Sequence, residues 1–408
     1  FKRKRKTRSL RIKLILKNIS ILYGNELKLI ESVTIQIIDN KFKKINSKII
    51  SKNEKIIDCT DLLLIPGFIN AHTHIGDSVA KDLSLNFNVN SKIHPMIGLK
   101  QKILRETPDR ELIKFIRKSA QSMLKKGITT FVDFREGGID GINLLKKALK
   151  NIPINVIILG RLEYYHTKTQ IKQNSIMPDF LKTELKSLLE NCDGVGISGP
   201  NENSDNNLIE YSKIKKIVGI HAAETLSSYY VSKKLSQKTE PKRALLANPT
   251  FLVHMTHASK NDLSFAAKKT QGIVICPRAN ASLAEGIPDI ALMLKMKCNL
   301  AIGTDNVMIN SPDMFREMDY LWKVTMGKNK TRIDPKQILK MATVNASKII
   351  NKKIGCIKEG YFADCLFIDK KSVDLEPLHN VHASIVHRAS QESIKAVMIG
   401  GKIIHGKI

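Results

Sequence analysis

An apolar run that ends in two histidines decides the fold: residues 62–74 read LLLIPGFINAHTH. The apolar character of residues 62–70 predicts a buried β-strand that ends just before the two histidines. In an extended chain, residues two apart point to the same side. His72 and His74 can therefore aim both imidazoles at one ion beyond the end of this strand. Alone the pair is a moderate signal, because structural and surface histidines also occur at this spacing.

Seven further apolar runs follow, separated by segments in which apolar residues recur at helical intervals. Residues 109–126, for example, carry them three and four positions apart. Repeated alternation of strand and helix predicts a parallel sheet, and eight units predict an α/β fold closed into a (β/α)8 TIM barrel. The runs lie at residues 128–134, 154–160, 194–198, 218–221, 251–254, 272–276 and 300–304.

Both ends of the chain differ from this middle part. Residues 10–62 and 355–408 hold short β-branched runs, separated by turn signals such as Gly24-Asn25 and Gly400-Gly401. We predict that both ends together form one small β-sandwich domain beside a barrel over residues 63–354. Residues 1–9 form a basic N-terminal tail to which we assign no catalytic role.

The overall composition is that of a folded protein with an excess of positive charge. Lys plus Arg number 67 against 38 Asp plus Glu, a net charge of +29 in 408 residues. The basic residues are spread along the chain, which favours solvent-facing lysines over a nucleic-acid or membrane surface. Six scattered cysteines without a CxxC pair argue against a disulfide framework and a cysteine zinc site. No apolar stretch reaches the roughly eighteen residues of a membrane span, and we expect a cytoplasmic location.

Chemically capable side chains follow the predicted strands, at the edge where TIM-barrel enzymes hold their active sites. His221 ends the fifth strand, His254 ends the sixth, and Asp305 follows the eighth. Three imidazoles and one carboxylate suit a borderline divalent ion, Zn²⁺ or alternatively Fe²⁺. We predict one such ion held by His72, His74, His221 and Asp305, which would activate water near neutral pH. The alternative is that Asp305 caps a helix and the histidines are satisfied core groups.

Taken in order, these motifs resemble the amidohydrolase superfamily. The nearest branch holds cytosine, guanine and S-adenosylhomocysteine deaminases and the triazine chlorohydrolases. The similarity rests on PGFINAHTH at residues 66–74, HAAE at 221–224, His254 and GTD at 303–305. It extends to GCIKEGYFAD at 355–364, and residues 383–387 and 397–402 resemble the family's closing strands.

The resemblance also implies roles for residues of the site. Glu224 matches the family's proton-shuttling acid, His254 matches the histidine that contacts the attacking water, and Asp305 would take a proton from that water. The fourth strand lacks the lysine that bridges two metals in other members, which favours a mononuclear site. Homodimerisation is a further expectation from the family.

The implied reaction is hydrolytic deamination of an aminated heterocycle or nucleoside-like compound. The protein would then be an aminohydrolase that acts on carbon–nitrogen bonds other than peptide bonds. Two alternatives stay open. The same scaffold could hydrolyse a cyclic amide, an amidine or a carbon–halogen bond. A non-catalytic structural or nucleic-acid-binding relative is disfavoured, because every ligand position is filled.

Candidate substrate-binding residues lie in the loops after the second and seventh strands: Arg135, Glu136, Arg278 and Asn280. Two guanidinium groups could together bind a carboxylate or phosphate. The alternative is that one or both pair with Glu136 or Glu285. The run CPRAN at residues 276–280 departs from the CPxSN of related deaminases, which puts a known nucleobase specificity in doubt. Residues 75–100 are expected to form a long loop that serves as a lid or pocket wall.

Overall fold

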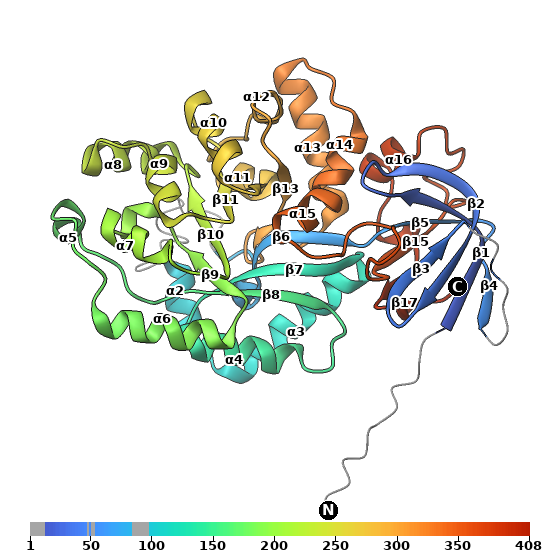
Figure 1. The fold of residues 1–408 in the computed structure, drawn as a ribbon, viewed down its shortest axis with the longest axis horizontal. Helices are drawn as coiled ribbons and strands as arrows, with labels where there is room; N and C mark the ends of the chain where they lie inside the picture. The colour runs from blue at the N-terminus through green and yellow to red at the C-terminus, as the bar shows by residue number, and fades with distance from the viewer. Residues whose placement is uncertain (1–12, 47–48, 50–53, 84–97) are drawn as a thin grey trace, which may run out of the picture.

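The structure is a computed structural model that describes residues 13–46, 49, 54–83 and 98–408. The chain forms two sheets: a parallel barrel, and a mixed sheet to which the blue N-terminal and red C-terminal strands both contribute (Figure 1). The predicted α/β class, a TIM barrel with a small β domain built from both chain ends, is confirmed. The basic tail at residues 1–9 lies outside the described residues.

The barrel strands are all parallel and pair in chain order. The short strand β14 (Asp305–Asn306) follows β13 along the chain and pairs with the first barrel strand, where Asp305 lies opposite Thr73. The strands β13 and β14 together make up the eighth strand of the barrel. The pairing of β14 with β6 therefore closes the barrel. The other strands are β6 (Phe68–His74), β7 (Ile128–Arg135), β8 (Asn155–Gly160), β9 (Gly194–Ile197), β10 (Ile217–Ala222), β11 (Phe251–His254), β12 (Gly272–Ile275) and β13 (Leu300–Ile302).

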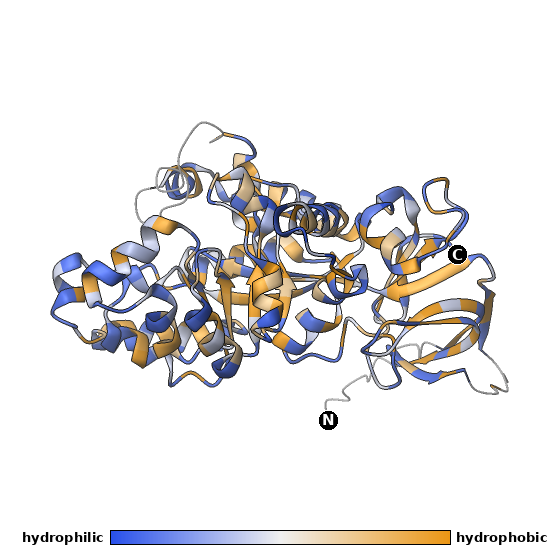
Figure 2. Ribbon diagram, turned by 90° about the horizontal axis from the view of Figure 1, so that it is seen from above, coloured by the Kyte–Doolittle hydropathy of each residue, from blue (hydrophilic) through white to orange (hydrophobic). Residues whose placement is uncertain are grey.

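Helices return the chain between these strands and cover the outside of the barrel (Figure 1). The helix expected over residues 109–126 is α3 (Asp109–Lys125), which buries Leu112, Ile116 and Met123 on one face. Figure 2 shows hydrophobic residues concentrated on the central strands and hydrophilic residues on the outer helix faces.

The remaining helices differ widely in length. The α-helices are α2 (Leu99–Glu106), α4 (Gly138–Leu149), α5 (Lys168–Lys172), α6 (Asp179–Asn191), α7 (Asp205–Tyr211), α8 (Leu226–Ser236), α9 (Glu240–Ala244), α10 (Lys260–Lys269), α11 (Pro277–Ser282), α12 (Ile290–Lys295), α13 (Met314–Asn329), α14 (Pro335–Met341), α15 (Val344–Ile349) and α16 (Val381–His387). The 3₁₀ helices are η1 (Ile75–Ala80), η2 (Pro200–Glu202), η3 (Leu245–Ala247) and η4 (Gln391–Ser393).

The small sheet has its own apolar core. Its N-terminal and C-terminal strands meet where β15 pairs antiparallel with β5. Its strand order is β17-β16-β15-β5-β1-β2-β3, with β4 beside β1. The strands are β1 (Lys13–Tyr23), β2 (Lys28–Ile38), β3 (Lys41–Ile45), β4 (Lys55–Asp58), β5 (Leu62–Pro66), β15 (Cys365–Asp369), β16 (Ile394–Ile399) and β17 (Lys402–Gly406).

The expected single strand over residues 62–70 is in fact two strands in two sheets. The segment β5 pairs with β1 and β15 of the small sheet, whereas β6 begins the barrel at Phe68. Gly67 lies between them, and a Cβ there would lie 2.4 Å from Oγ1 of Thr129. The chain thus crosses between the sheets at a point with no room for a side chain, and an apolar run does not reveal that break.

Two other expectations need correction. Residues 383–387, which resemble a closing strand, belong to the helix α16, where Asn380 caps the helix and Ile385 and Val386 are buried. This helix packs on α13 and α14, so its apolar side chains serve a helical interface. The segment 75–100 is not wholly a loop, because η1 occupies its start and α2 begins at Leu99; residues 84–97 lie outside the described residues. Within the described ranges, no helix has the length and apolar character needed to cross a membrane.

Candidate active site

Four predicted metal ligands meet at the end of the barrel where the strands finish. His72 and His74 are buried at the end of β6, two residues apart as the strand period requires. His72 Nε2 lies 3.2 Å from His221 Nε2 and 3.4 Å from Asp305 Oδ1. His74 Nε2 lies 3.6 Å from the same Asp305 oxygen. The strand-end pattern in the sequence therefore identified side chains that come together in space.

These donor atoms fit a divalent cation. Ligand atoms that bind zinc tetrahedrally at about 2.0–2.1 Å lie about 3.4 Å from one another. Three of the distances between these donor atoms, 3.2, 3.4 and 3.6 Å, match that spacing. The second ring nitrogens of two ligands are already engaged, since His221 Nδ1 lies 2.9 Å from the Ile197 carbonyl and His74 Nδ1 lies 2.8 Å from Glu136 Oε1. Such contacts leave Nε2 as the lone-pair donor.

The protonation states also suit metal binding. Burial lowers the pKa of His72 to about 3, and burial lowers the pKa of His221 well below its usual value. Both imidazoles are therefore neutral near pH 7, which is the form that binds a metal. Burial alone would raise the pKa of Asp305, but its hydrogen bond to His72 and the surrounding histidines lower it instead. The site thus combines neutral nitrogen donors with an ionised carboxylate.

A phenylalanine supports the histidines from inside the barrel. The Phe134 ring centroid lies 4.4 Å from that of His72 and 5.0 Å from that of His221, both edge-on. Glycines on the neighbouring strands make room for this ring: a Cβ on Gly196 would lie 2.5 Å from it, and one on Gly219 would lie 2.6 Å from it. The small residues of β9 and β10 therefore allow an aromatic ring to hold two of the predicted metal ligands in place.

Beside the ligands lies a second group formed by His254 and two carboxyl groups. His254 Nε2 is 3.6 Å from Glu224 Oε2 and 3.9 Å from Asp305 Oδ2. On the other side of the ring, His254 Nδ1 is 3.4 Å from the Asn280 side-chain oxygen. Burial raises the pKa of Glu224, whereas that of Asp305 is lowered. Two carboxyl groups tuned in opposite directions beside one imidazole can divide the acid and base roles of a reaction.

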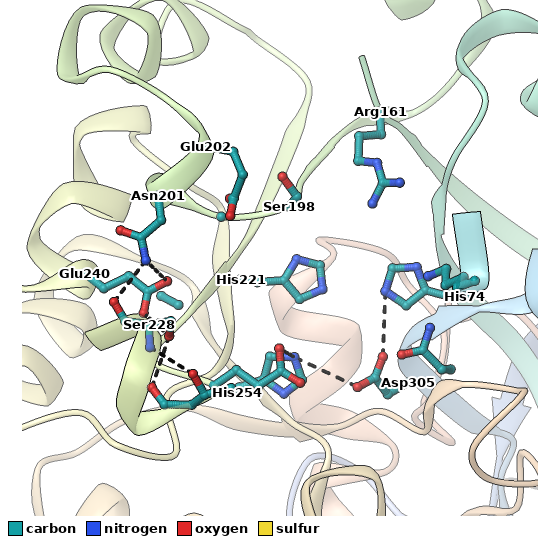
Figure 3. A pocket seen from close by; sticks show the side chains of 16 residues that line it. His74, Arg161, Ser198, Asn201, Glu202, His221, Ser228, Glu240, His254 and Asp305 are labelled. Atoms are coloured by element: carbon teal, nitrogen blue, oxygen red, sulfur yellow. Dashed lines mark hydrogen bonds and ion pairs between the residues drawn. The ribbon is translucent and has the colours of Figure 1, made fainter. Parts of the chain in front are cut away.

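The cavity over this cluster measures about 120 Å³. In Figure 3, His74, His221, His254 and Asp305 lie around one part of it, while other polar side chains extend along the remaining walls. The polar side chains of the lining are His74, Lys100, Arg161, Ser198, Asn201, Glu202, His221, Glu224, Thr225, Ser228, Glu240, His254, Asp305 and Asn306. A cavity with so many hydrogen-bonding groups suits a small polar substrate.

The comparisons with known proteins agree with this geometry. A family model described as "Amidohydrolase family" matches residues 63–404. The chain belongs to the amidohydrolase family. A Methanothermobacter thermautotrophicus protein named "Putative aminohydrolase" is 35% identical to this amidohydrolase over 395 residues, 96% of this chain and 99% of that one.

Two other similar proteins bear names of deaminases. A 5-methylthioadenosine/S-adenosylhomocysteine deaminase of Thermococcus sibiricus is 27% identical over 417 residues, 96% of this amidohydrolase and 93% of that protein. A zinc-bound adenosine deaminase structure from Xanthomonas campestris superimposes with a TM-score of 0.82 at 17% identity, over 96% of this chain and 92% of that one. At that identity the superposition shows the fold alone, and it confirms the barrel.

The four candidate substrate-binding residues of this amidohydrolase do not gather in the cavity. Glu136 contacts His74 and lies 2.5 Å from Lys100 Nζ, and Asn280 contacts His254. Arg135 donates from Nε to the Glu136 carbonyl and lines a separate cavity. Arg278 Nη1 lies 3.3 Å from Oε1 of Glu317. Glu317 is neither of the two carboxylates, Glu136 and Glu285, that the sequence offered as partners. The two guanidinium groups are thus engaged apart from each other, so this arrangement does not form a shared anion site.

One further pocket residue follows from the sequence, and several others do not. Arg161 directly follows β8, in a loop that the strand-end rule predicts as a pocket wall, whereas Glu202 lies in η2, five residues after the end of β9. Lys100 and Glu240 lie at the starts of α2 and α9, away from any strand end, and no motif marks them. Their place in the site follows from helix packing, which a local pattern does not encode.

Proposed function

We propose that this amidohydrolase removes an amino group hydrolytically from an aminated heterocycle or a nucleoside-like compound, with one zinc ion as cofactor and Fe²⁺ as the alternative. The observation that carries the proposal is the placement of His254 between Glu224 and Asp305, directly beside the converging histidine donors. The names of similar proteins, an aminohydrolase and a 5-methylthioadenosine/S-adenosylhomocysteine deaminase, support the same reaction class.

The residues of the site divide the proton transfers of such a hydrolysis. A bound divalent ion supplies a Lewis acid that makes water a nucleophile near neutral pH. Asp305, whose lowered pKa keeps it ionised, accepts the proton that the water loses. Glu224, whose pKa is raised by burial, holds a proton for the heterocycle and then for the departing ammonia. Each positioned transfer of this kind contributes about 10²- to 10⁴-fold in rate.

His254 is the third side chain with a chemical role, because its imidazole would contact the attacking water at the reacting carbon. Its ring is buried and held by Asn280, so Nε2 is fixed toward the space between the two carboxyl groups. The products are ammonia and a carbonyl compound, and the atoms of the water are divided between them. A single ion is proposed because β9, which reads Gly-Val-Gly-Ile, offers no lysine that could bridge a second one.

The test is a metal analysis of the purified protein together with an ammonia-release screen of purines, pyrimidines, pterins and their nucleosides. We expect about one zinc per chain. The variant His72→Ala is expected to lose both the metal and any ammonia release. His387→Ala is the matched control, because His387 stacks on Trp322 far from the ligands and should keep both.

The outcomes separate the candidate functions. A bound metal without ammonia release from any amine would redirect the search to cyclic amides, amidines and carbon–halogen bonds. A wild-type protein that binds no metal after reconstitution would refute the proposed function altogether.

A further inference from the structure

Glu240 lies outside the set of residues with proposed chemical roles, although its carboxyl group lines the same cavity. It is the first residue of α9 and is buried. Oε2 accepts hydrogen bonds from the Ala223 amide at 2.9 Å and from Ser228 Oγ at 2.7 Å. Oε1 accepts from Asn201 Nδ2 at 3.4 Å, and Figure 3 shows Glu240 between Asn201 and Ser228. The residue therefore joins three separate segments around the cavity.

The most informative of these contacts is the one to Ala223. This residue has φ +51°, in the left-handed region that non-glycine residues adopt only against a steric cost. It stands directly before Glu224 and two positions after His221. Both of its peptide groups are held from outside, since its N–H donates to Glu240 and its carbonyl accepts from the His257 amide at 3.0 Å.

The left-handed turn determines where the next side chain points. The strand β10 ends at Ala222, and a continued strand would carry the following side chains alternately inward and outward. The turn at Ala223 breaks that alternation, and Glu224 then reaches His254 with its Oε2 at 3.6 Å from Nε2. An unfavourable backbone conformation at this position persists only where surrounding contacts fix it.

We propose that Glu240 is a positioning residue, whose hydrogen bond to the Ala223 amide holds the turn that presents Glu224 to His254. The expected effect of Glu240 on kcat rests on the proposed function, because Glu224 is the proton carrier in the proposed deamination. A purely structural role for Glu240 would lower stability without selectively lowering kcat.

The kinetic test uses the metal-loaded full chain and the amine with the highest turnover in the ammonia-release screen. Glu240→Ala is expected to lower kcat by about 10- to 100-fold, since a small displacement of a reacting group can cost about 100-fold. KM should change by less than about threefold, because a positioning role gives Glu240 no contact of its own with the substrate. Glu240→Gln should retain most of the activity, because its side-chain oxygen can still accept from the Ala223 amide.

A second variant tests the backbone strain itself. Glycine adopts the left-handed conformation without steric cost, so Ala223→Gly should reduce the need for Glu240. We expect Glu240→Ala to lower kcat at least about threefold less in the Ala223→Gly background than in the wild type. A role for Glu240 in general stability would give the same loss in both backgrounds.

Asp262 supplies the matched control. It is a buried carboxylate that accepts from Thr239 Oγ1 at 2.6 Å and from Tyr229 OH at 3.2 Å, so it also joins α8, α9 and α10. It has no hydrogen bond to Ala223 among the described residues. Asp262→Asn should lower the melting temperature while kcat stays within about twofold of the wild type.

Two kinetic results for Glu240→Ala would overturn the proposal. One is a kcat equal to that of the wild type, and the other is a rise in KM with unchanged kcat.

A crystal structure of Glu240→Ala gives a readout that needs no substrate. The proposal expects Ala223 to leave the left-handed region and the Glu224–His254 distance to grow beyond 3.6 Å. An unchanged turn would overturn it. If the wild type releases no ammonia, the proposed function fails, but this structure still decides the role of Glu240.

Discussion

Replacement of Glu136 by glutamine is expected to weaken binding of the proposed zinc ion, although Glu136 is not one of the proposed ligands. Its Oε1 lies 2.8 Å from His74 Nδ1 and 2.5 Å from Lys100 Nζ, and all three side chains are buried. Burial alone would raise the pKa of Glu136, but Lys100 and His74 bring that pKa well below its usual value. A carboxylate in this position fixes the tautomer and orientation of the imidazole and raises its basicity as a ligand.

The size of the effect follows from what glutamine keeps and what it loses. The amide oxygen can still accept from His74, but a hydrogen bond to a charged group contributes about 1.5–3 kcal/mol against about 0.5–1.5 kcal/mol for a neutral one. The difference of about 1–1.5 kcal/mol corresponds to roughly a tenfold loss of affinity. Lys100 also loses its closest anionic partner. We therefore expect Kd to rise by about 10- to 100-fold, the range typical of outer contacts to metal ligands.

The assay is a titration of the metal-free protein with Zn²⁺ in competition with a chromogenic chelator. Lys100→Met keeps the Glu136 carboxylate and removes the positive charge beside it. The variant therefore distinguishes the effect of that charge on zinc affinity from the effect of the Glu136–His74 contact. Glu163→Gln is the matched control, because Glu163 lies 3.7 Å from Arg161 Nε but contacts no histidine among the described residues. A wild-type Kd in Glu136→Gln, with an unchanged melting temperature, would refute the reasoning.

Three further predictions concern stability. Burial raises the pKa of Glu240 to about 7, so from about pH 5 to pH 7 the folded protein holds a proton that the unfolded chain has released; its free energy of unfolding should fall over that window, and thermal melts of Glu240→Gln should show a smaller fall. Arg278→Met should lower the free energy of unfolding by about 1–3 kcal/mol in urea titrations, because buried Glu317 loses its partner, and should leave KM unchanged. Removal of the metal with a chelator should lower the melting temperature, since a ligand at 100 times its Kd stabilises the folded state by about 2.7 kcal/mol.

Each of these expectations has a contrary result. A constant difference between wild-type and Glu240→Gln melting temperatures across this pH range would show that Glu240 keeps its ordinary titration. A several-fold rise in KM for Arg278→Met would place Arg278 in substrate binding after all. Identical melting curves with and without metal would mean that the ion does not bind the folded state in preference to the unfolded one.

The meeting of the four proposed ligands could be predicted from the sequence because two geometric rules suffice for it. The strand period places His72 and His74 on one side, and a parallel barrel brings the ends of all its strands to one rim. His221 and Asp305 follow runs that are readable as strands, so their meeting with the first two follows from topology alone. None of these inferences needs side-chain packing.

The residues that support the ligands could not be predicted in this way. Lys100 enters the site on α2, and its contact with Glu136 depends on how that helix packs against the barrel. Arg278 has an acidic partner from α13, Glu317, 39 positions along the chain. A charged side chain beyond a strand end, such as Arg278 in α11, finds its partner through three-dimensional packing, and the sequence offers many carboxylates at comparable separations.

The proposed metal ligands straddle the point at which the barrel closes. His72 and His74 belong to β6, and Asp305 belongs to β14, whose short pairing with β6 joins the first and last strands. Asp305 has φ +59°, so the left-handed turn at this residue interrupts the eighth strand where the carboxylate must face the histidines. The pairing opposite Thr73 fixes that turn, in the same way that the contact from Glu240 fixes the one at Ala223. An ion bound by residues of both strands would cross-link the seam, because separating the strands would break the coordination. Barrel closure and metal affinity would then be thermodynamically coupled.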